Sequence, residues 1–204
     1  MPDVDALYGR ARTLLRGWHV PAAACGLIVI ALCGALLPHL LHLPQMANGA
    51  QIATPIGALA GWLAGLLALL TAQEPAPALF ATAPRITHVV NVTRLLLMLL
   101  CGLLVACVTT DGSMLVPLSA GATFAGEGLV LAGLAGLRTA WLFPTLHLLA
   151  CIALGNTNRV QGLAVWAWPL DQHPGIGQLA ASGLLLTAGA ALWASSLRSP
   201  ERDS

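Results

Sequence analysis

One carboxylate in the middle of a long apolar run is the residue of this sequence best placed to do chemistry. Glu127 is flanked by Gly126 and Gly128 in a stretch rich in leucine and alanine. At the centre of a membrane helix a charged acid costs about 2.5 kcal/mol or more, so it should face the protein interior or carry a proton. We expect Glu127 to handle a cation or proton or to contact a cationic substrate on a transport path. The alternatives are that Glu127 is neutral and hydrogen-bonded to a neighbouring helix, or that the span is shifted and Glu127 lies near a membrane interface.

Histidines are the next candidates, because imidazole binds metals and titrates near neutral pH. His39 and His42 form an H-x-x-H pair, and on a helix residues three apart share a face that could bind a metal or, less readily, a haem. Pro38 and Pro44 interrupt this segment, so a polar pair at the membrane interface is favoured and no metal site is predicted. His147 lies in an apolar run and is better explained as a hydrogen-bonded core histidine than as a ligand.

No residue pattern points to catalysis by this chain. The serines lack a glycine-flanked elbow or a matched Lys or His. The five cysteines form no C-x-x-C pair and are expected to pack as small apolar residues. The sequence contains no lysine, whereas a P-loop needs one to reach the phosphates of ATP. We expect a chain that is not an enzyme and that binds no cofactor itself.

The composition indicates that lipid is the solvent of most of the surface. Of the 204 residues 57% are hydrophobic and only 8% are charged, with a mean hydropathy of +0.81. Soluble proteins carry about a quarter of their residues as charged ones. The net charge of +1 gives no reason to expect nucleic-acid binding.

Six apolar runs are long enough, or nearly so, to cross a bilayer as helices, which takes about 20 residues. The predicted spans are 18–37, 55–72, 95–110, 114–137, 140–155 and 176–197. The fifth is the shortest. Continuous Leu/Ala-rich runs favour helices over barrel strands, which alternate apolar and polar residues. The predicted fold is an all-α integral membrane protein with six transmembrane helices.

The arginines predict which side of the membrane each loop occupies. With a cytoplasmic N-terminus, all but one of them lie inside: Arg10, Arg12, Arg16, Arg85, Arg94, Arg138, Arg198 and Arg202. Only Arg159 lies outside, which is a clear positive-inside bias. Both termini are therefore predicted to be cytoplasmic, and the location to be a bacterial plasma (inner) membrane.

Short segments flank the predicted transmembrane domain of residues 18–197. In residues 1–17, apolar residues recur at three- and four-residue steps, with Asp5, Arg12 and Arg16 on other faces. This pattern is typical of an amphipathic helix on the inner leaflet, although an extended first membrane helix fits it too. Residues 198–204 form a cytoplasmic tail.

The longest predicted cytoplasmic connection, residues 73–94, is not a polar linker. It has an apolar side with Leu79 and Phe80 and a charged side with Glu74, Arg85 and Arg94. An apolar segment that faces water is typical of a docking surface for another protein, although it could also pack on its own bundle.

The same connection resembles the coupling segment of membrane subunits of the ABC-2 transporter family. The matching residues are Glu74, Leu79, Ala81, Thr82, Pro84 and Arg85. Ala83 is an insertion, and Pro75 stands where the family usually has glycine. The resemblance implies a six-span permease whose coupling segment docks on a separate ATPase subunit that holds ATP and Mg. Together with Phe80 on the apolar side and His88 and Arg94 on the charged side of the segment, the resemblance gives these expected contact residues: Glu74, Leu79, Phe80, Thr82, Pro84, Arg85, His88 and Arg94.

Three glycines at four-residue intervals in the second span predict close helix packing. Gly57, Gly61 and Gly65 share one helix face, and glycine lets another backbone approach closely. The partner could be a helix of the same bundle or of a second copy.

The expected function is that of the membrane subunit of an ATP-driven exporter, paired with a second permease copy or a sister permease. The low polarity of the helices favours an amphipathic or hydrophobic substrate such as an antibiotic, peptide or lipid. Two alternatives remain: a haem- or quinone-binding membrane subunit that uses His39, His42 and His147, and a structural membrane protein that transports nothing.

Overall fold

We describe the protein from a computed structural model. The residues described are 20–37, 40–44, 51–72, 84–110, 113–157 and 162–196. The predicted amphipathic segment 1–17, residues 73–83 of the predicted docking segment and the tail 198–204 lie outside them.

The described residues form a mostly helical bundle with two short hairpins. The helices are α2 (Val20–Leu36), α3 (Ile56–Thr71), α5 (Pro84–Thr109), α6 (Leu115–Ala135), α7 (Leu142–Leu154), the 3₁₀ helix η1 (Val165–Leu170) and α8 (Ile176–Ser196). The strands are β1 (Leu40–Pro44), β2 (Gln51–Pro55), β3 (Asn156–Thr157) and β4 (Gly162–Leu163).

Three described helical stretches are long and apolar enough to cross a membrane: Asn91–Thr109, Leu115–Ala135 and Ile176–Ser196. Three apolar helices are shorter: Pro21–Leu36, Ile56–Thr71 and Leu142–Leu154. Large apolar side chains face outward on these helices, and they include Val108 at 82% exposure and Leu36 at 75%. A surface of this kind suits lipid, and the chain has the character of a membrane protein.

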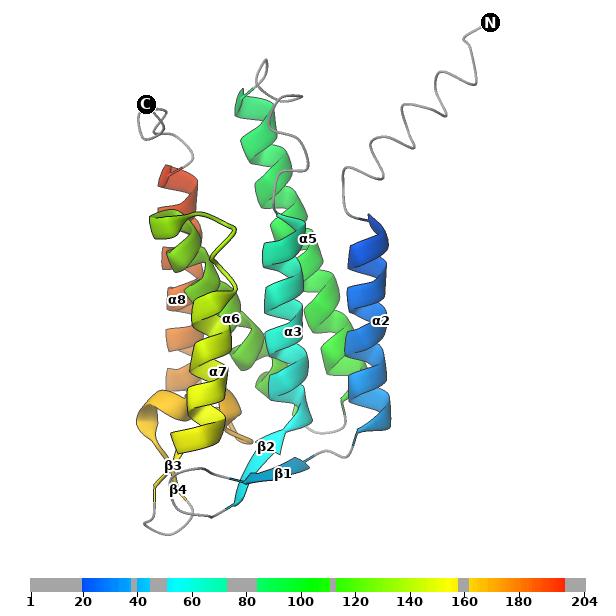
Figure 1. The fold of residues 1–204 in the computed structure, drawn as a ribbon, viewed down its shortest axis with the longest axis vertical. Coiled ribbons are helices and arrows are strands. Elements are labelled where there is room, and N and C mark those ends of the chain that lie inside the picture. Colours follow the sequence, from blue (N-terminus) through cyan, green and yellow to red (C-terminus); the bar gives the residue numbers. More distant parts are fainter. Residues whose placement is uncertain are drawn as a thin grey trace, which may run out of the picture.

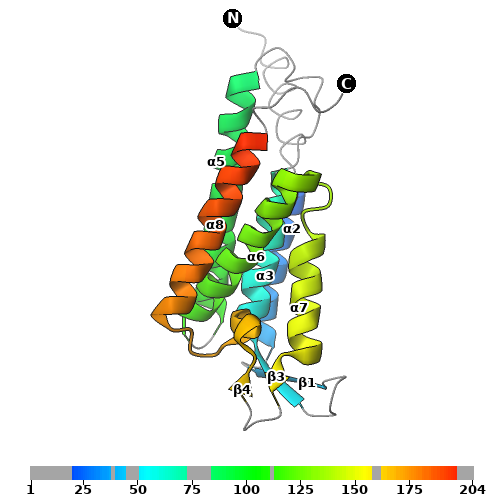
Figure 2. The same ribbon diagram turned by 90° about the vertical axis from the view of Figure 1, so that its left-hand side faces the viewer.

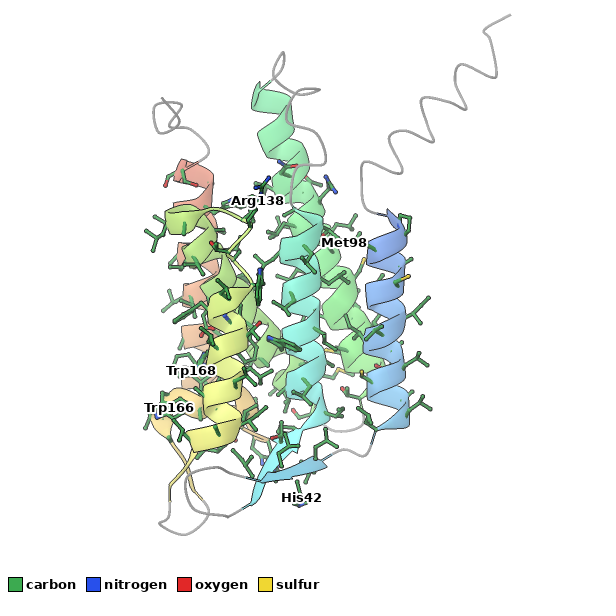
Figure 3. The ribbon with its side chains drawn as sticks, viewed as in Figure 1. His42, Met98, Arg138, Trp166 and Trp168 are labelled. Atoms are coloured by element: carbon green, nitrogen blue, oxygen red, sulfur yellow. The ribbon has the colours of Figure 1, made fainter. Side chains whose placement is uncertain are left out.

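The helices run along the long axis of the molecule, with the hairpins and η1 gathered at one end (Figures 1 and 2). Consecutive α-helices point in opposite directions. The end that carries the start of α5 and the turn between α6 and α7 is called the arginine end, because Arg138 lies there (Figure 3). The opposite end is called the hairpin end.

Helix α6 occupies the centre of the bundle. About 72% of its span is buried, against 17% for α8. Its most extensive contacts are with α8 and α3, and it also contacts α5, α7 and η1. A side chain near the middle of α6 is therefore surrounded by protein rather than by lipid.

Glycines allow α6 to approach its two main neighbours closely. A Cβ added to Gly61 of α3 would lie 2.6 Å from the carbonyl oxygen of Pro117, and one added to Gly65 would lie 3.1 Å from the Ala125 nitrogen. On the other side of α6, a Cβ on Gly126 would lie 2.7 Å from the carbonyl carbon of Leu185 in α8. The structure places the Gly57, Gly61 and Gly65 face against α6 of the same chain.

Most helix ends lie close to their predicted positions, and one does not. The third span was expected to begin at residue 95, but α5 begins at Pro84 and forms a helix of 26 residues. Arginine, histidine and threonine are all compatible with a helix, so the loss of hydropathy before residue 95 does not end the helix. Pro117 and Pro144 lie in the first turns of α6 and α7, where proline disturbs little.

The hairpins are a feature that the all-α prediction lacks. Strands β1 and β2 pair antiparallel, with Leu43 opposite Ile52. Ile52 is buried and packs with Leu43 on the hairpin end of the core. His42 lies in strand β1 and is exposed, so the helix face that the metal alternative would need does not form at His42. Its predicted companion His39 lies outside the described residues.

Candidate functional site

Glu127 is buried near the middle of the central helix. It is the thirteenth residue of α6, counted from Leu115, and only 5% of its surface is exposed. Gly126 and Gly128 on either side admit the neighbouring elements so closely that Leu185 of α8 and Leu69 of α3 lie against them. The carboxyl group is thus enclosed by protein at about the middle of the bundle.

The partner of Glu127 is His147 of the antiparallel neighbour α7. The distance between His147 Nδ1 and Glu127 Oε1 is 2.5 Å. The other ring nitrogen, Nε2, lies 3.0 Å from the backbone carbonyl oxygen of Trp166 in η1. One imidazole therefore joins the central helix, α7 and the 3₁₀ segment.

These two contacts determine where the protons of the pair can be. A carbonyl oxygen only accepts, so His147 Nε2 carries a hydrogen and donates it to Trp166. The short Nδ1 to Oε1 contact then holds one proton, either on the imidazole or on the carboxyl group. In both cases the pair has no net charge. A neutral pair avoids the large cost of an isolated charge inside the bilayer.

Aromatic rings cover His147. The ring centroids of Phe124, Trp166 and Phe143 lie 5.8, 6.3 and 6.5 Å from that of the imidazole. The Phe124 ring meets it edge to face and is fully buried. This apolar shell lowers the local dielectric, which strengthens the hydrogen bond between His147 and Glu127.

The second carboxyl oxygen of Glu127 has unmet hydrogen-bonding capacity. Oε2 is buried and has no hydrogen-bond partner among the described residues. Buried polar atoms in proteins nearly always have a partner. An atom without one marks a position that a donor from a ligand, a proton or an ordered water would satisfy.

A second polar cluster lies one to two turns from Glu127 toward the hairpin end. Thr123 Oγ1 and Ser182 Oγ are 2.8 Å apart across the contact of α6 with α8, and Ser119 Oγ lies 3.2 Å from Ser182 Oγ. The indole of Trp168 in η1 donates to Thr123 Oγ1 at 3.1 Å. The three hydroxyls are buried and hold η1 against α6 and α8.

The connection from η1 to α8 closes this cluster from outside. Gln178 in the first turn of α8 donates to Asp171 Oδ2 at 2.9 Å and accepts the Gly175 N–H at 2.7 Å. Asp171 Oδ1 accepts the His173 backbone N–H at 3.0 Å. The segment 165–178 is therefore a hydrogen-bonded cap on the hairpin end of the bundle.

The predicted docking residues are only partly described. Glu74, Leu79, Phe80 and Thr82 lie outside the described residues. Pro84, Arg85 and His88 belong to the first turns of α5, and Arg94 lies further along the same helix with 7% of its surface exposed. The predicted docking segment therefore continues into a helix that enters the bundle.

The redox alternative would use His39, His42 and His147. Both ring nitrogens of His147 are engaged by protein atoms, and His42 is exposed in strand β1. No group of three or more His, Cys, Asp or Glu side chains gathers in a way that could hold a metal ion within the described ranges.

Sequence reasoning selected Glu127 but missed its partner. His147 is twenty residues away, and the pairing depends on the turn at residues 136–141 that sets α7 against α6. The available signal was a histidine on the helix after an intramembrane acid, because successive spans are antiparallel neighbours. The hydroxyls of Ser119 and Thr123 carried no comparable signal.

Comparisons with known proteins leave the family open: no protein-family model, no curated protein and no solved structure matches this chain.

Proposed function

We propose that this chain is the six-span permease subunit of an ABC-type exporter. In this proposal α2, α3, α5, α6, α7 and α8 all cross the bilayer, and both termini are cytoplasmic. The alternation of helix direction supports an even number of crossings. With about 1.5 Å per residue, α5 is about 39 Å long and α7 about 20 Å, against a hydrocarbon core of about 30 Å.

The distribution of positive charge supports this orientation. Arg85 and Arg94 belong to the first half of α5, and Arg138 follows α6, so all three lie toward the arginine end. The described residues at the hairpin end, in 40–44, 51–55 and 162–175, include no arginine. Positive residues remain in the cytoplasm, which makes the arginine end the inner one.

The observation that carries the transport proposal is the continuity of α5. This single helix begins within the predicted docking segment, at Pro84, and continues to Thr109 inside the bundle. Its start extends beyond the ends of its neighbours (Figures 1 and 2). A stiff helix that begins at the site of a bound ATPase would carry a displacement of that subunit to α3 and α2, against which α5 packs.

ATP hydrolysis belongs to the separate subunit, because this chain has no lysine for a P-loop. The cargo is an amphipathic or hydrophobic molecule. Glu127 is the acidic group that a rearrangement of α6 against α7 would release from His147 and present to a cationic part of the substrate. Oε2 of Glu127, whose hydrogen-bonding capacity is unmet, is the atom that would bind the cationic group first.

The test is whether the chain retains an ATPase that depends on the docking segment. The tagged chain is purified from its native membranes in mild detergent, and the retained subunits are identified by mass spectrometry and assayed for ATP hydrolysis. We expect a P-loop subunit to be retained by the native chain and lost in Glu74→Arg and Arg85→Glu.

The matched controls are Glu201→Arg and Arg202→Glu, which make the same charge changes in the C-terminal tail and should keep the ATPase. If no P-loop protein is retained, or if the tail variants lose it as readily as the docking variants, the exporter proposal is wrong.

A further inference from the structure

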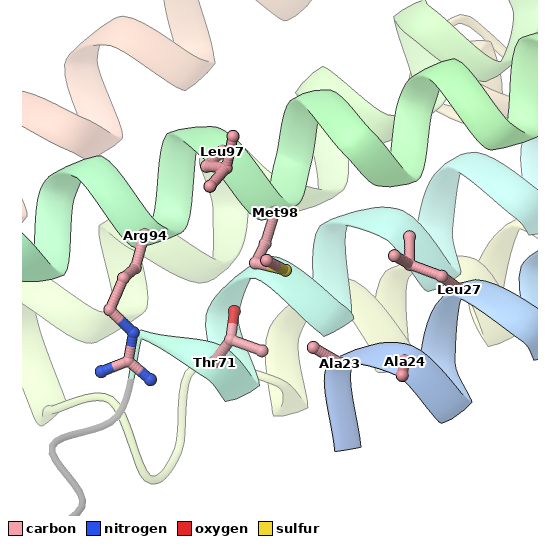
Figure 4. Close-up of a pocket in the computed structure, with 7 residues that line it drawn as sticks. All are labelled: Ala23, Ala24, Leu27, Thr71, Arg94, Leu97 and Met98. Atoms are coloured by element: carbon pink, nitrogen blue, oxygen red, sulfur yellow. The ribbon is translucent and has the colours of Figure 1, made fainter. Parts of the chain in front are cut away.

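A pocket lies between α2, α3 and α5 toward the arginine end, away from Glu127. Its volume is about 220 Å³. Figure 4 shows Arg94, Leu97 and Met98 on α5, Thr71 at the end of α3, and Ala24 and Leu27 on α2 around this space. Five apolar side chains thus line this space together with the hydroxyl-bearing Thr71 and with Arg94, whose guanidinium group lies at one end.

Polarity changes with depth along this pocket. Arg94 and Thr71 lie at its arginine end, since Thr71 is the last residue of α3 and Arg94 is the fourth residue of the apolar stretch that begins at Asn91. Leu97 and Met98 follow one turn deeper on α5. Leu27 lies two turns into α2. A ligand that fills the pocket therefore needs an anionic group at one end and hydrocarbon behind it.

The pocket is open toward the side of the bundle. Leu97 is 51% exposed and Ala24 is exposed, and both line it. The neighbouring outward residues Ile28 of α2 and Leu100 of α5 are each 57% exposed. Entry is thus available from the bilayer between α2 and α5.

We propose that this pocket binds one anionic phospholipid of the inner leaflet, with its phosphate on Arg94. A guanidinium carries five N–H donors and matches phosphate oxygens in pairs, so it can bind an anion while it keeps its contacts to the protein. The cytoplasmic leaflet is rich in anionic lipids, and basic pockets between membrane helices on that side recognise their headgroups.

The volume of about 220 Å³ leaves room for part of a phospholipid and not for the whole molecule. The rest of the lipid would lie outside, along Ile28 and Leu100. The proposed orientation decides only which leaflet supplies the phospholipid. The lipid proposal does not depend on whether an ATPase binds this chain.

Native mass spectrometry of the detergent-purified chain tests the proposal. The protein is delipidated and titrated with dioleoylphosphatidylglycerol, with dioleoylphosphatidylcholine or with inorganic phosphate. We expect one phosphatidylglycerol to bind at least tenfold more tightly than phosphatidylcholine, and millimolar phosphate not to displace it. Arg94→Gln should weaken this binding about tenfold or more.

Two pairs of variants separate the site from general effects. Ala24→Phe fills the pocket from its exposed side while Arg94 remains, and it should reduce binding, whereas Ala22→Phe, on the exposed surface one half-turn earlier, should not. Arg138→Gln removes a positive charge at the same end of the molecule and should bind as the native chain does. Equal binding of the two lipids, displacement by phosphate, or unchanged binding in either Arg94→Gln or Ala24→Phe would overturn the proposal.

Discussion

At the scale of single residues, the buried hydrogen bonds of Glu127 and His147 decide what the middle of the bundle can tolerate. The carboxyl group and the imidazole share a proton over 2.5 Å, and the imidazole donates its other hydrogen to Trp166. Each group alone would be an unpaired polar group among aromatic rings. Together they form a neutral unit that three elements of the bundle enclose.

The first prediction concerns the energetic coupling of this pair. Glu127→Ala leaves His147 Nδ1 without its partner, and we expect it to lower the free energy of unfolding by about 3 to 5 kcal/mol, the range for a broken buried pair. Glu127→Gln keeps a hydrogen-bonding group and should cost about 1 kcal/mol. The measurement is unfolding of the purified protein in mixed micelles by a denaturing detergent.

The double variant Glu127→Ala, His147→Phe completes a double-mutant cycle with the two corresponding single variants. Its loss of unfolding free energy should be smaller than the sum of the two single losses by about 1 to 2 kcal/mol. Thr187→Ala is the control, because the Thr187 hydroxyl donates only to carbonyls of its own helix and is exposed. Strictly additive effects of the two single changes would show that the pair is not coupled.

At the scale of elements, glycine contacts set the distance between the central helix and its neighbours. A Cβ on Gly189 of α8 would clash with the carbonyl oxygen of Gly126 and would lie 3.1 Å from the Leu129 Cβ. A Cβ on Gly183 of the same helix would meet nothing within 4 Å. The two positions therefore separate the loss of a close contact from the ordinary effect of replacing glycine in a helix.

The second prediction uses this difference. Gly189→Ala forces α8 away from α6 and stretches the contacts that hold Ser182 to Thr123, so we expect a loss of about 1 to 3 kcal/mol in unfolding free energy. Gly183→Ala should be neutral or stabilise the protein by up to about 1 kcal/mol, since alanine favours the helix. Both are measured by the same detergent unfolding. Equal effects at the two sites would contradict the packing described here.

The limits of sequence-based prediction are also clearest at this scale. Continuous apolar runs located the apolar helices of the described residues, because hydrophobicity and length are local properties of the chain. The strands β1 and β2 were missed, since a five-residue strand between prolines has no strong pattern of its own. The pairing of Glu127 with His147 was missed as well, because it depends on how two helices are set against each other by a short turn.

At the scale of the whole molecule, the short helix α7 decides the topology. It has 13 residues and spans about 20 Å, less than the hydrocarbon thickness of about 30 Å. If α7 crosses the bilayer, the turn after α6 and the cap at 165–178 lie on opposite sides of the membrane. If it does not, they lie on the same side.

The third prediction is that Thr139 is cytoplasmic and His173 is external. The five native cysteines are first replaced by alanine, and single variants Thr139→Cys and His173→Cys are labelled with a membrane-impermeant maleimide. We expect His173→Cys to react in spheroplasts or intact cells, and Thr139→Cys to react only in inside-out vesicles. Retention of Arg138 in both variants preserves the charge that orients the turn. Labelling of both positions from one side would show that α7 does not cross the bilayer. The chain would then have an odd number of crossings, and its two termini would lie on opposite sides of the membrane. The docking proposal, which depends on two cytoplasmic termini, would then be wrong.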